Sequence, residues 1–203
     1  MRETQRAALL PVGFFARPAS VVAEALIGAV VWSSIDGGLT AGRVVETEAY
    51  LGHEDPASHA FGHRRHAQNE ALYGLPATWY VYRSYGMHWC ANLVCQSSEQ
   101  GSAVLLRALE PIAGLETMRV RRRGVVDREL CSGPGKLCQA LGMTRGIDGV
   151  PMRRSAVQVR RGMPAGTMQI VAGPRVGITR AAEWPLRFME SGSRWVSRGP
   201  VRL

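Results

Sequence analysis

Hydrophobic and polar residues alternate most regularly in VVETEAYL, residues 44–51, and this alternation predicts a β-strand. Because successive side chains of a strand point to opposite faces, Glu46, Glu48 and Tyr50 should share one face. Val44 should precede them on that face, while the side chains between them form an apolar face. A strand that places two carboxylates and an aromatic ring together indicates a candidate site.

The pattern around this strand predicts further elements. Pro18 stands at a first-turn position before SVVAEALIGAVVW, which predicts a helix that runs into a strand. Gly37 and Gly38 then turn the chain into the 44–51 strand. Residues 53–76 show no clear period, which predicts a long loop with room for a short helix. Long loops in compact domains are often functional.

The second half of the chain contains the clearest hairpin. TWYVYRSYGMHWCANLVCQ forms two β-rich runs around Ser84-Tyr85-Gly86. AVLLRALEP predicts a short apolar strand, and we expect Pro111 to open a helix through GLETMRVRRR. Ser132 is predicted to cap a helix through KLCQAL that ends at Gly142.

No repeat, low-complexity tract or linker divides residues 1–203, since Gly and Pro are spread along the chain as turns. The elements also lack the βα alternation of parallel sheets. We therefore expect a single α+β domain with a mostly antiparallel, curved β-sheet, flanking helices and a protruding β-hairpin. A chain of 203 residues is long enough to bury about 70% of its unfolded surface.

The net charge of the chain indicates a class of binding partner. The formal net charge is +9 and the pI is near 10.2, and Lys136 is the only lysine among 25 Lys and Arg residues. Such a surplus favours a polyanion, because cations that neutralise phosphates release counterions. Nucleic acid is therefore the expected class of partner.

Composition also predicts the compartment. No apolar run approaches the roughly 20 residues that span a bilayer, and Glu3 and Pro11 interrupt the pattern of a secretory signal. We expect a cytoplasmic protein without membrane contact. In that reducing compartment, all four cysteines should be buried free thiols that pack like small hydrophobic groups. They are Cys90, Cys95, Cys131 and Cys138.

Metal binding is not predicted. The five histidines all fall between residues 53 and 88, but their spacing matches no zinc site. We expect neither a metal nor a cofactor.

Two single residues carry further predictions. Arg107 lies inside the apolar run 103–109, where an unpaired guanidinium would be costly, so it should pair with Glu46 or Glu48. Such a cation would also separate the two carboxylates, and we expect Glu46 to be structural. Tyr85 at the hairpin turn is a large exposed ring, which on a basic protein suggests a wedge between bases.

Six sequence blocks resemble those of a known protein family and follow one another in the same order as in that family: VVETEAYLGHEDPASHAFG, YVYRSYGMHWCANLV, AVLLRALEPIAGLETMR, DRELCSGPGKLCQALG, GPRVGITRAAEWPLRF and GSRWVS. Together they resemble the 3-methyladenine (alkyladenine) DNA glycosylase family over about residues 12–198. Several contiguous blocks in family order are far more specific than one short motif.

The resemblance implies roles for the catalytic residues. Glu48 resembles the general base that activates water for attack on the sugar C1′ carbon. Arg107 resembles the residue that helps to hold that water, and a main-chain carbonyl near Val176 is expected to share this task.

The resemblance also implies how DNA is bound. Tyr50, His59 and Tyr82 resemble the walls that stack on a flipped base. Asn92 resembles the side chain that crowds the exocyclic amino group of a normal guanine. Two further residues lie nearer the duplex. Tyr85 resembles the intercalating residue, and Lys136, at a helix start, resembles a phosphate contact.

The implied function is a DNA repair glycosylase that flips out alkylated or deaminated purines from double-stranded DNA and hydrolyses the N-glycosidic bond. The expected substrates are of the 3-methyladenine, 7-methylguanine, hypoxanthine and ethenoadenine class. A single lysine leaves little choice for a Schiff-base nucleophile, so we expect a monofunctional enzyme that leaves an abasic site. We further expect a monomer, associated with the nucleoid of a bacterium.

Two alternatives remain open at this point. One is a non-catalytic nucleic-acid-binding module on the same fold, in which Glu48→Gln would leave every activity unchanged. The other is a hydrolase or transferase for a small charged metabolite, which would bind DNA weakly and without salt dependence.

Overall fold

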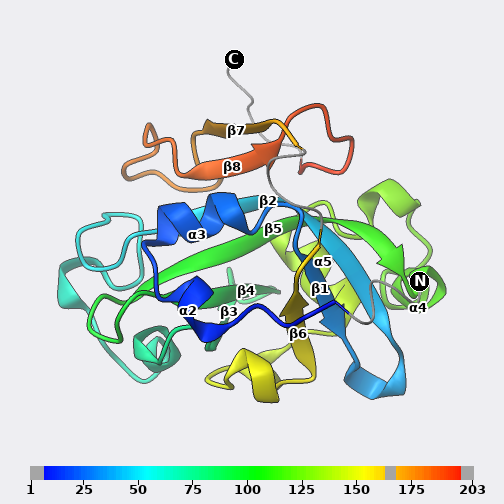
Figure 1. Cartoon of the computed structure of the whole chain (residues 1–203), viewed down its shortest axis with the longest axis horizontal. Coiled ribbons are helices and arrows are strands. Elements are labelled where there is room, and N and C mark those ends of the chain that lie inside the picture. The colour runs from blue at the N-terminus through cyan, green and yellow to red at the C-terminus, as the bar shows by residue number, and fades with distance from the viewer. Residues whose placement is uncertain (1–6, 163–167, 198–203) are drawn as a thin grey trace.

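A strongly twisted antiparallel sheet organises the chain, and the computed structural model describes residues 7–162 and 168–197 (Figure 1). Within these residues the sheet has eight strands, of which six follow the order β3-β4-β5-β2-β1-β6. The strands are β1 (Val30–Ser33), β2 (Thr40–Tyr50), β3 (Trp79–Ser84), β4 (His88–Cys95), β5 (Ser102–Ala113), β6 (Val157–Arg160), β7 (Ile170–Gly173) and β8 (Arg187–Glu190).

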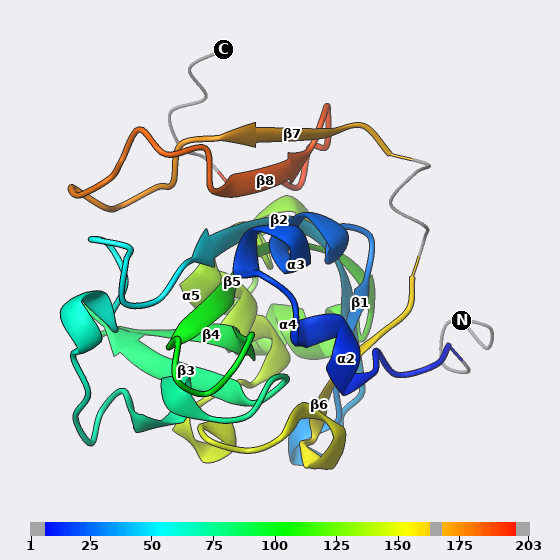
Figure 2. The same ribbon diagram turned by 60° about the vertical axis from the view of Figure 1, so that its left-hand side comes forward.

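The long strand β2 is the centre of the sheet. It pairs with β5 along its length, with β1 in its first half and with β8 from Glu46 to Glu48. The β7–β8 hairpin therefore continues the sheet on the side of β2 opposite β5 at this position, as Figure 2 shows. Glu46 and Glu48 consequently lie on a strand that is hydrogen-bonded on both sides, where the backbone is firmly held.

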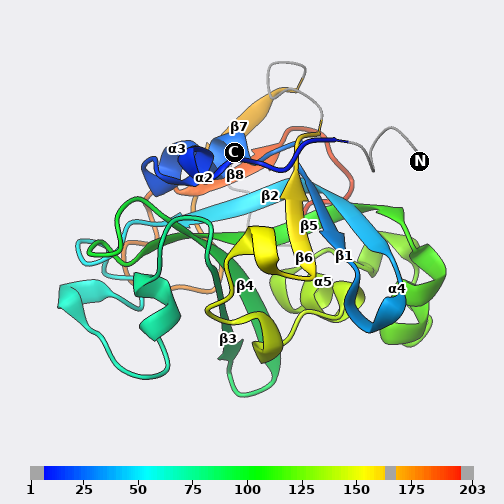
Figure 3. The same ribbon diagram turned by 60° about the horizontal axis from the view of Figure 1, so that its bottom comes forward.

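Helices cover both faces of the central strands. Figure 3 shows β2 and β5 between α3 and α5. The α-helices are α2 (Val12–Phe15), α3 (Ala19–Ala25), α4 (Leu115–Arg121) and α5 (Pro134–Leu141). Short 3-10 turns are η1 (Ile35–Gly37), η2 (Phe61–His63), η3 (Glu70–Tyr73), η4 (Asp127–Glu129), η5 (Arg145–Ile147) and η6 (Met152–Arg154). Among the described residues, none of the helices is long and apolar enough to pass through a lipid bilayer.

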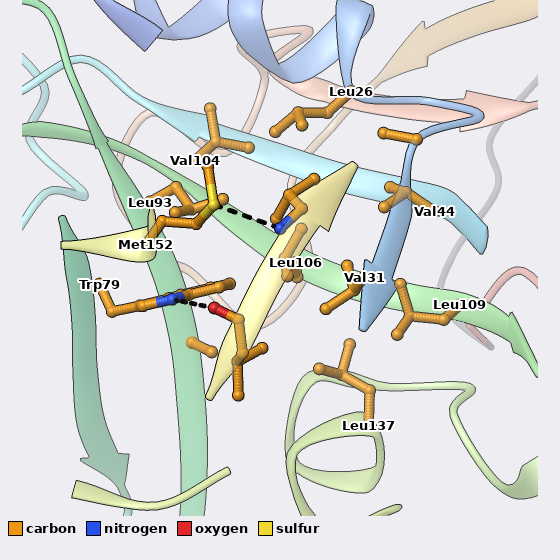
Figure 4. Close-up of a cluster of buried hydrophobic side chains, with 14 of the residues drawn as sticks. Leu26, Val31, Val44, Trp79, Leu93, Val104, Leu106, Leu109, Leu137 and Met152 are labelled. Atoms are coloured by element: carbon orange, nitrogen blue, oxygen red, sulfur yellow. Dashed lines mark hydrogen bonds between the residues drawn. The ribbon is translucent and has the colours of Figure 1, made fainter. Parts of the chain in front are cut away.

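The main hydrophobic core joins these layers (Figure 4). Leu26 next to α3, Leu106 in β5 and Leu137 in α5 are fully buried in it, and each contributes about 1.5–3 kcal/mol by burial. Trp79 at the start of β3 is also fully buried, and its indole Nε1 donates a hydrogen bond of 3.0 Å to the Val157 carbonyl. The base of the β3–β4 hairpin is thereby fixed to β6.

The predicted α+β fold with an antiparallel sheet and flanking helices is confirmed, as are the helix after Pro18 and the β3–β4 hairpin. Gly142 ends α5 in the left-handed conformation (φ 72°), as predicted. The four cysteines are buried and free, which confirms the prediction for their side chains.

The expected helix start at Pro111 is wrong, because Pro111 lies in β5 and α4 begins only at Leu115. Proline is tolerated there because β4 pairs only with the first residues of β5, and because the pairing with β2 is irregular next to Gly42. Gly114 instead separates strand from helix, with a φ of 71° that favours glycine.

Two smaller predictions also need correction. Ser132 does not cap α5: the cap position is Gly133, and Pro134 at the first helical position starts the helix with its fixed φ. Val44 does not share a face with Glu46 and Glu48, because the register of β2 shifts between Val44 and Glu46. Val44 therefore packs in the main core.

Candidate active site

An open cavity of about 1150 Å³ is bordered by parts of the chain that are far apart in sequence. Its lining comes from the end of β2, the loop after it, both strands of the β3–β4 hairpin, the start of α5 and the segment 176–178. Seven of the eight predicted site residues line it: Tyr50, His59, Tyr82, Tyr85, Asn92, Arg107 and Lys136. The sheet and hairpin thus bring the predicted residues into one site.

Glu48, the eighth predicted residue, lies fully buried behind the cavity wall. Its Oε1 accepts a hydrogen bond of 2.7 Å from the Val176 amide and lies 3.2 Å from Arg107 Nη1. Its Oε2 accepts a hydrogen bond of 2.9 Å from the Tyr50 hydroxyl. All three partners line the cavity, so the carboxylate is separated from the cavity only by the groups that hold it.

The environment of Glu46 differs from that of Glu48, which explains how two carboxylates can lie on the same face of one strand. It is fully buried and accepts hydrogen bonds from Arg107 Nε (3.0 Å), Arg187 Nε (2.6 Å) and the backbone and hydroxyl of Ser197 (2.7 and 2.9 Å). A carboxylate with so many donors has little capacity left for a substrate or water. This geometry supports a structural role for Glu46.

Arg107 bridges the two carboxylates, which confirms the expectation that it pairs with one of them. Burial of this guanidinium lowers its pKa, but the charges of Glu48 and Glu46 outweigh burial and the pKa of Arg107 is raised overall. Arg107 is therefore a fixed positive charge at the cavity wall.

Aromatic rings form one wall of the cavity. The Tyr82 ring stacks on Tyr80 at 5.4 Å between centroids, and the His59 ring meets Tyr82 edge-on at 4.5 Å. The His59 Nδ1 and the Tyr80 hydroxyl lie 2.7 Å apart and share a hydrogen bond. The rings are thus held against one another, which leaves their positions little freedom.

Protonation states in this wall follow from burial. Burial raises the pKa of Tyr50 and of Tyr82 well above 10.0, with added contributions from Glu48 to the first and Cys90 to the second. Loss of hydration around the His59 ring, helped by electrostatic interaction with the neighbouring His66 and Arg64, lowers the pKa of His59 from 6.5. At neutral pH the wall therefore consists of neutral phenols and a neutral imidazole.

Asn92 lies opposite Tyr80 on the neighbouring strand of the β3–β4 hairpin. It is buried, lines the cavity and donates a hydrogen bond of 3.0 Å from Nδ2 to the Tyr80 carbonyl. The carboxamide is therefore oriented by the same strand that carries the aromatic rings.

The hairpin tip presents Tyr85, whose side chain is 83% exposed. Tyr85 has a φ of 49° and is followed by Gly86 at 67°, so both residues lie in the left-handed region. A bulky residue with positive φ stores strain of about 1–3 kcal/mol, and such strain often lies at functional sites. The exposure expected for Tyr85 is confirmed.

Basic side chains surround the cavity opening. Lys136 lies in the first turn of α5, as predicted, with its Nζ 3.6 Å from Glu129 Oε2 and 3.4 Å from Ser132 Oγ. Four arginines also belong to the lining: Arg64, Arg83, Arg122 and Arg145. This rim can neutralise phosphate charge around a ligand.

The described ranges 7–162 and 168–197 contain no group of three or more His, Cys, Asp or Glu side chains that could hold a metal ion. The histidines instead make ring contacts, as between His53 and His63, whose rings stack at 4.2 Å.

Sequence reasoning missed some of the site. Tyr80 alternates with Tyr82 in YVY and therefore faces the same side, a signal that was available. The buried pair of Asp55 and Arg175 gave no signal, because 120 positions separate the two residues and neither belongs to a periodic segment. The amide of Val176 is equally invisible in a side-chain pattern.

Comparison with known proteins agrees with this geometry. A family profile described as methylpurine-DNA glycosylase matches residues 13–194. A protein of Rhodopseudomonas palustris (strain HaA2) is 49% identical over 91% of this chain and 88% of its own length, and one of Rhizobium meliloti (strain 1021) is 49% identical over 92% and 95%. Both carry the name 3-methyladenine DNA glycosylase as a provisional assignment. The human DNA-3-methyladenine glycosylase is 45% identical over 93% of this chain and 67% of its own length.

The fold, the cavity with its buried carboxylate, and these matches define a DNA glycosylase of base excision repair. The chain belongs to the methylpurine-DNA glycosylase family, and its enzyme class is that of a DNA-3-methyladenine glycosylase.

Proposed function

We propose that this enzyme flips alkylated or deaminated purines out of double-stranded DNA and hydrolyses their N-glycosidic bond with a water molecule that Glu48 activates. The observation that carries the proposal is the position of Glu48, buried and held by three groups that line an aromatic cavity with a basic rim. The substrate class comprises 3-methyladenine, 7-methylguanine, hypoxanthine and ethenoadenine.

In the chemical step, the water oxygen forms a bond to C1′ while the bond from C1′ to the base nitrogen breaks. The base leaves with the electron pair of that bond, and Glu48 takes a proton from the water. General-base action of this kind contributes roughly 10²- to 10⁴-fold. Glu48 also offers negative charge to the sugar as it becomes oxocarbenium-like.

The hydrogen bonds of Glu48 support this role. Oε2 has one protein donor, Tyr50, so a lone pair remains for water. Arg107 is neutralised by two carboxylates and can hold the water with its remaining N–H capacity. A share for a main-chain carbonyl near Val176 stays a prediction, since the recorded contact of Val176 is its amide.

The aromatic wall suits the base. Tyr50, His59 and Tyr82 would stack on a flipped purine, and a cationic methylpurine between such rings gains on the order of 1–2 kcal/mol when desolvated. Asn92 would crowd the amino group of normal guanine, a specificity that its buried and oriented side chain is suited to provide.

Outside the cavity, Tyr85 would fill the space that the base has left, where stacking contributes about 1–3 kcal/mol. Lys136 would contact a phosphate at the start of α5. Its ammonium lies close to the Glu129 carboxylate, which is unfavourable for an amine nucleophile. We therefore expect a monofunctional enzyme that leaves an abasic site, acts as a monomer and works at the chromosome in a bacterial cytoplasm.

The test uses labelled duplexes that carry one hypoxanthine or one ethenoadenine, incubated with wild type or Glu48→Gln and then treated with alkali. We expect strand cleavage only with wild type and only after alkali. Cleavage without alkali would contradict monofunctional action, and equal cleavage by both proteins would remove Glu48 from the mechanism. Tight, salt-sensitive duplex binding by a wild type that excises neither base, and releases no methylpurine from alkylated DNA, would favour a binding module.

A further inference from the structure

A buried ion pair joins the two segments that border the cavity next to Glu48. Arg175 Nη1 and Nη2 donate to Asp55 Oδ2 and Oδ1 at 2.5 and 2.9 Å, a bidentate pair, and both side chains are fully buried. Two parallel hydrogen bonds fix the direction of both groups as well as their distance.

Asp55 and Arg175 each make further contacts with the chain around them. Asp55 accepts hydrogen bonds from the amides of Leu51 and Ala57, which fold the loop after β2 around the carboxylate. Arg175 donates to the Ala49 carbonyl at 3.0 Å, and its guanidinium lies over the Tyr50 ring at 4.8 Å from the centroid. The guanidinium, fixed by Asp55, therefore restricts the position of the Tyr50 ring.

Val176, the residue after Arg175, contacts Glu48, the proposed general base. The Val176 amide donates to Glu48 Oε1, and the following residues Gly177 and Ile178 line the cavity. Val176 belongs to no helix or strand, and Gly177 has a φ of 79°, so regular secondary structure does not fix this segment. Among the described contacts, the Arg175–Asp55 pair is the strongest tie between this segment and the β2 side of the cavity.

We propose that Arg175 and Asp55 act as a clamp that positions Tyr50 and the Val176 amide against the two oxygens of Glu48. They are positioning residues, since each acts through another group and neither lines the cavity. This inference rests on the proposed function of Glu48. A general base is effective only when its lone pair is aimed at the water, and a misplacement of about 1 Å can cost roughly 100-fold in rate.

The appropriate variant is the double substitution Arg175→Met with Asp55→Asn. Removing one partner alone would leave an unpaired charge in a buried place and destabilise the fold, whereas the double variant removes both charges and keeps the side-chain sizes similar. Arg175→Lys is the second variant, because lysine keeps the charge but cannot form the two parallel bonds.

A matched control pair lies elsewhere in the sheet. Arg43 pairs with Glu190 at 2.8 Å between β2 and β8, and neither residue is among the described residues that line the cavity. Arg43 also pairs with Glu110 at 2.7 Å, so the control variant is Arg43→Met with Glu110→Gln and Glu190→Gln, which removes buried charge from this region without leaving an unpaired carboxylate.

Two measurements distinguish the positioning effect of the clamp from the catalytic activity itself. Hydrogen exchange of the Val176 amide reports whether its bond to Glu48 is held, and needs no substrate. Single-turnover excision with saturating enzyme reports the chemical step, and the salt-dependent affinity for the lesion duplex is measured alongside.

We expect the double variant to exchange the Val176 amide at least about 10-fold faster and to lose roughly 10- to 100-fold in single-turnover rate. Its duplex affinity should stay within about 3-fold, because phosphate contacts dominate it. Arg175→Lys should show the same changes to a smaller extent, and the control variant should match wild type in both measurements.

Wild-type exchange and excision in the folded double variant would overturn the clamp, as would equal losses in the control. If the double variant does not fold, wild-type behaviour of Arg175→Lys in both measurements would overturn it. A wild type that excises nothing, with Val176 exchange responding as expected, would instead refute the proposed function and leave the clamp in place.

Discussion

Arg107 lies between the two carboxylates of β2, with Nε 3.0 Å from Glu46 Oε1 and Nη1 3.2 Å from Glu48 Oε1. The guanidinium reaches β2 from the neighbouring strand β5, at a position where the register of the two strands shifts. Arg107 is therefore shared by two buried acids: Glu46 has a second cation, Arg187, at 2.6 Å, whereas Glu48 lies directly behind the cavity wall.

Substitution of Arg107 by Met should impair both stability and excision. Two buried carboxylates would face each other without a cation between them, and breaking a buried pair in this way costs about 3–5 kcal/mol. The excision rate should fall by more than about 10-fold, because the group that would hold the water is lost. Chemical denaturation and single-turnover excision measure the two effects. A variant with normal stability would show that Glu46 and Glu48 do not depend on this cation.

The same substitution should affect mainly stability at Glu46 and mainly excision at Glu48. Glu46→Gln removes the charge that Arg107 and Arg187 both contact, so the free energy of unfolding should fall by about 3–5 kcal/mol. Glu48→Gln should cost less stability but abolish excision. Urea unfolding curves and single-turnover rates per folded molecule, measured for both variants, make the comparison. Loss of chemistry in the two variants to the same extent, at equal folded fraction, would contradict the separation of roles.

For the β2 and hairpin parts of the candidate site, the sequence could indicate which side chains share a face, for a physical reason. The alternation of side chains along a strand is local, so Glu48, Tyr50, Tyr80 and Tyr82 can be assigned to a face from their spacing alone. Arg107 could be paired with a carboxylate because an unpaired guanidinium in an apolar run is costly.

Other features could not be read from the chain. The register shift in β2 that moves Val44 into the core depends on its pairing with β5, which is a non-local property. Pro111 resembles a helix start locally, but the strand partners decide its state. The Asp55–Arg175 pair and the Val176 amide depend on how distant loops meet, and no periodic signal marks such contacts.

His59 should make stability depend on pH. Its pKa in the folded protein is lowered from 6.5, so the unfolded chain binds more protons at His59 in mildly acidic solution. The stabilisation by neutral His59 is therefore complete above about pH 6.5 and is lost as the pH falls through the folded pKa. Unfolding free energies of wild type and His59→Gln from pH 5 to 7.5 test this. The difference between the two proteins should change with pH in this range, and a constant difference would contradict the assignment.

Tyr85 offers a prediction in which stability and function move in opposite directions. Its ring is 83% exposed, so little packing is lost in Tyr85→Gly. Glycine should relieve strain of about 1–3 kcal/mol at the φ of 49° but bring an entropic cost of roughly 0.5–1 kcal/mol, so stability should be unchanged or slightly raised. If the ring fills the space of the flipped base, the same variant should lose about 1–3 kcal/mol of stacking, roughly 5- to 150-fold in affinity for a lesion duplex. Tyr85→Phe is the matched control, since it keeps the ring and should bind like wild type. Thermal unfolding measures the effect on stability, and equilibrium binding to a hypoxanthine duplex measures the effect on affinity. Full affinity in Tyr85→Gly would show that the exposed ring does not stack in the duplex.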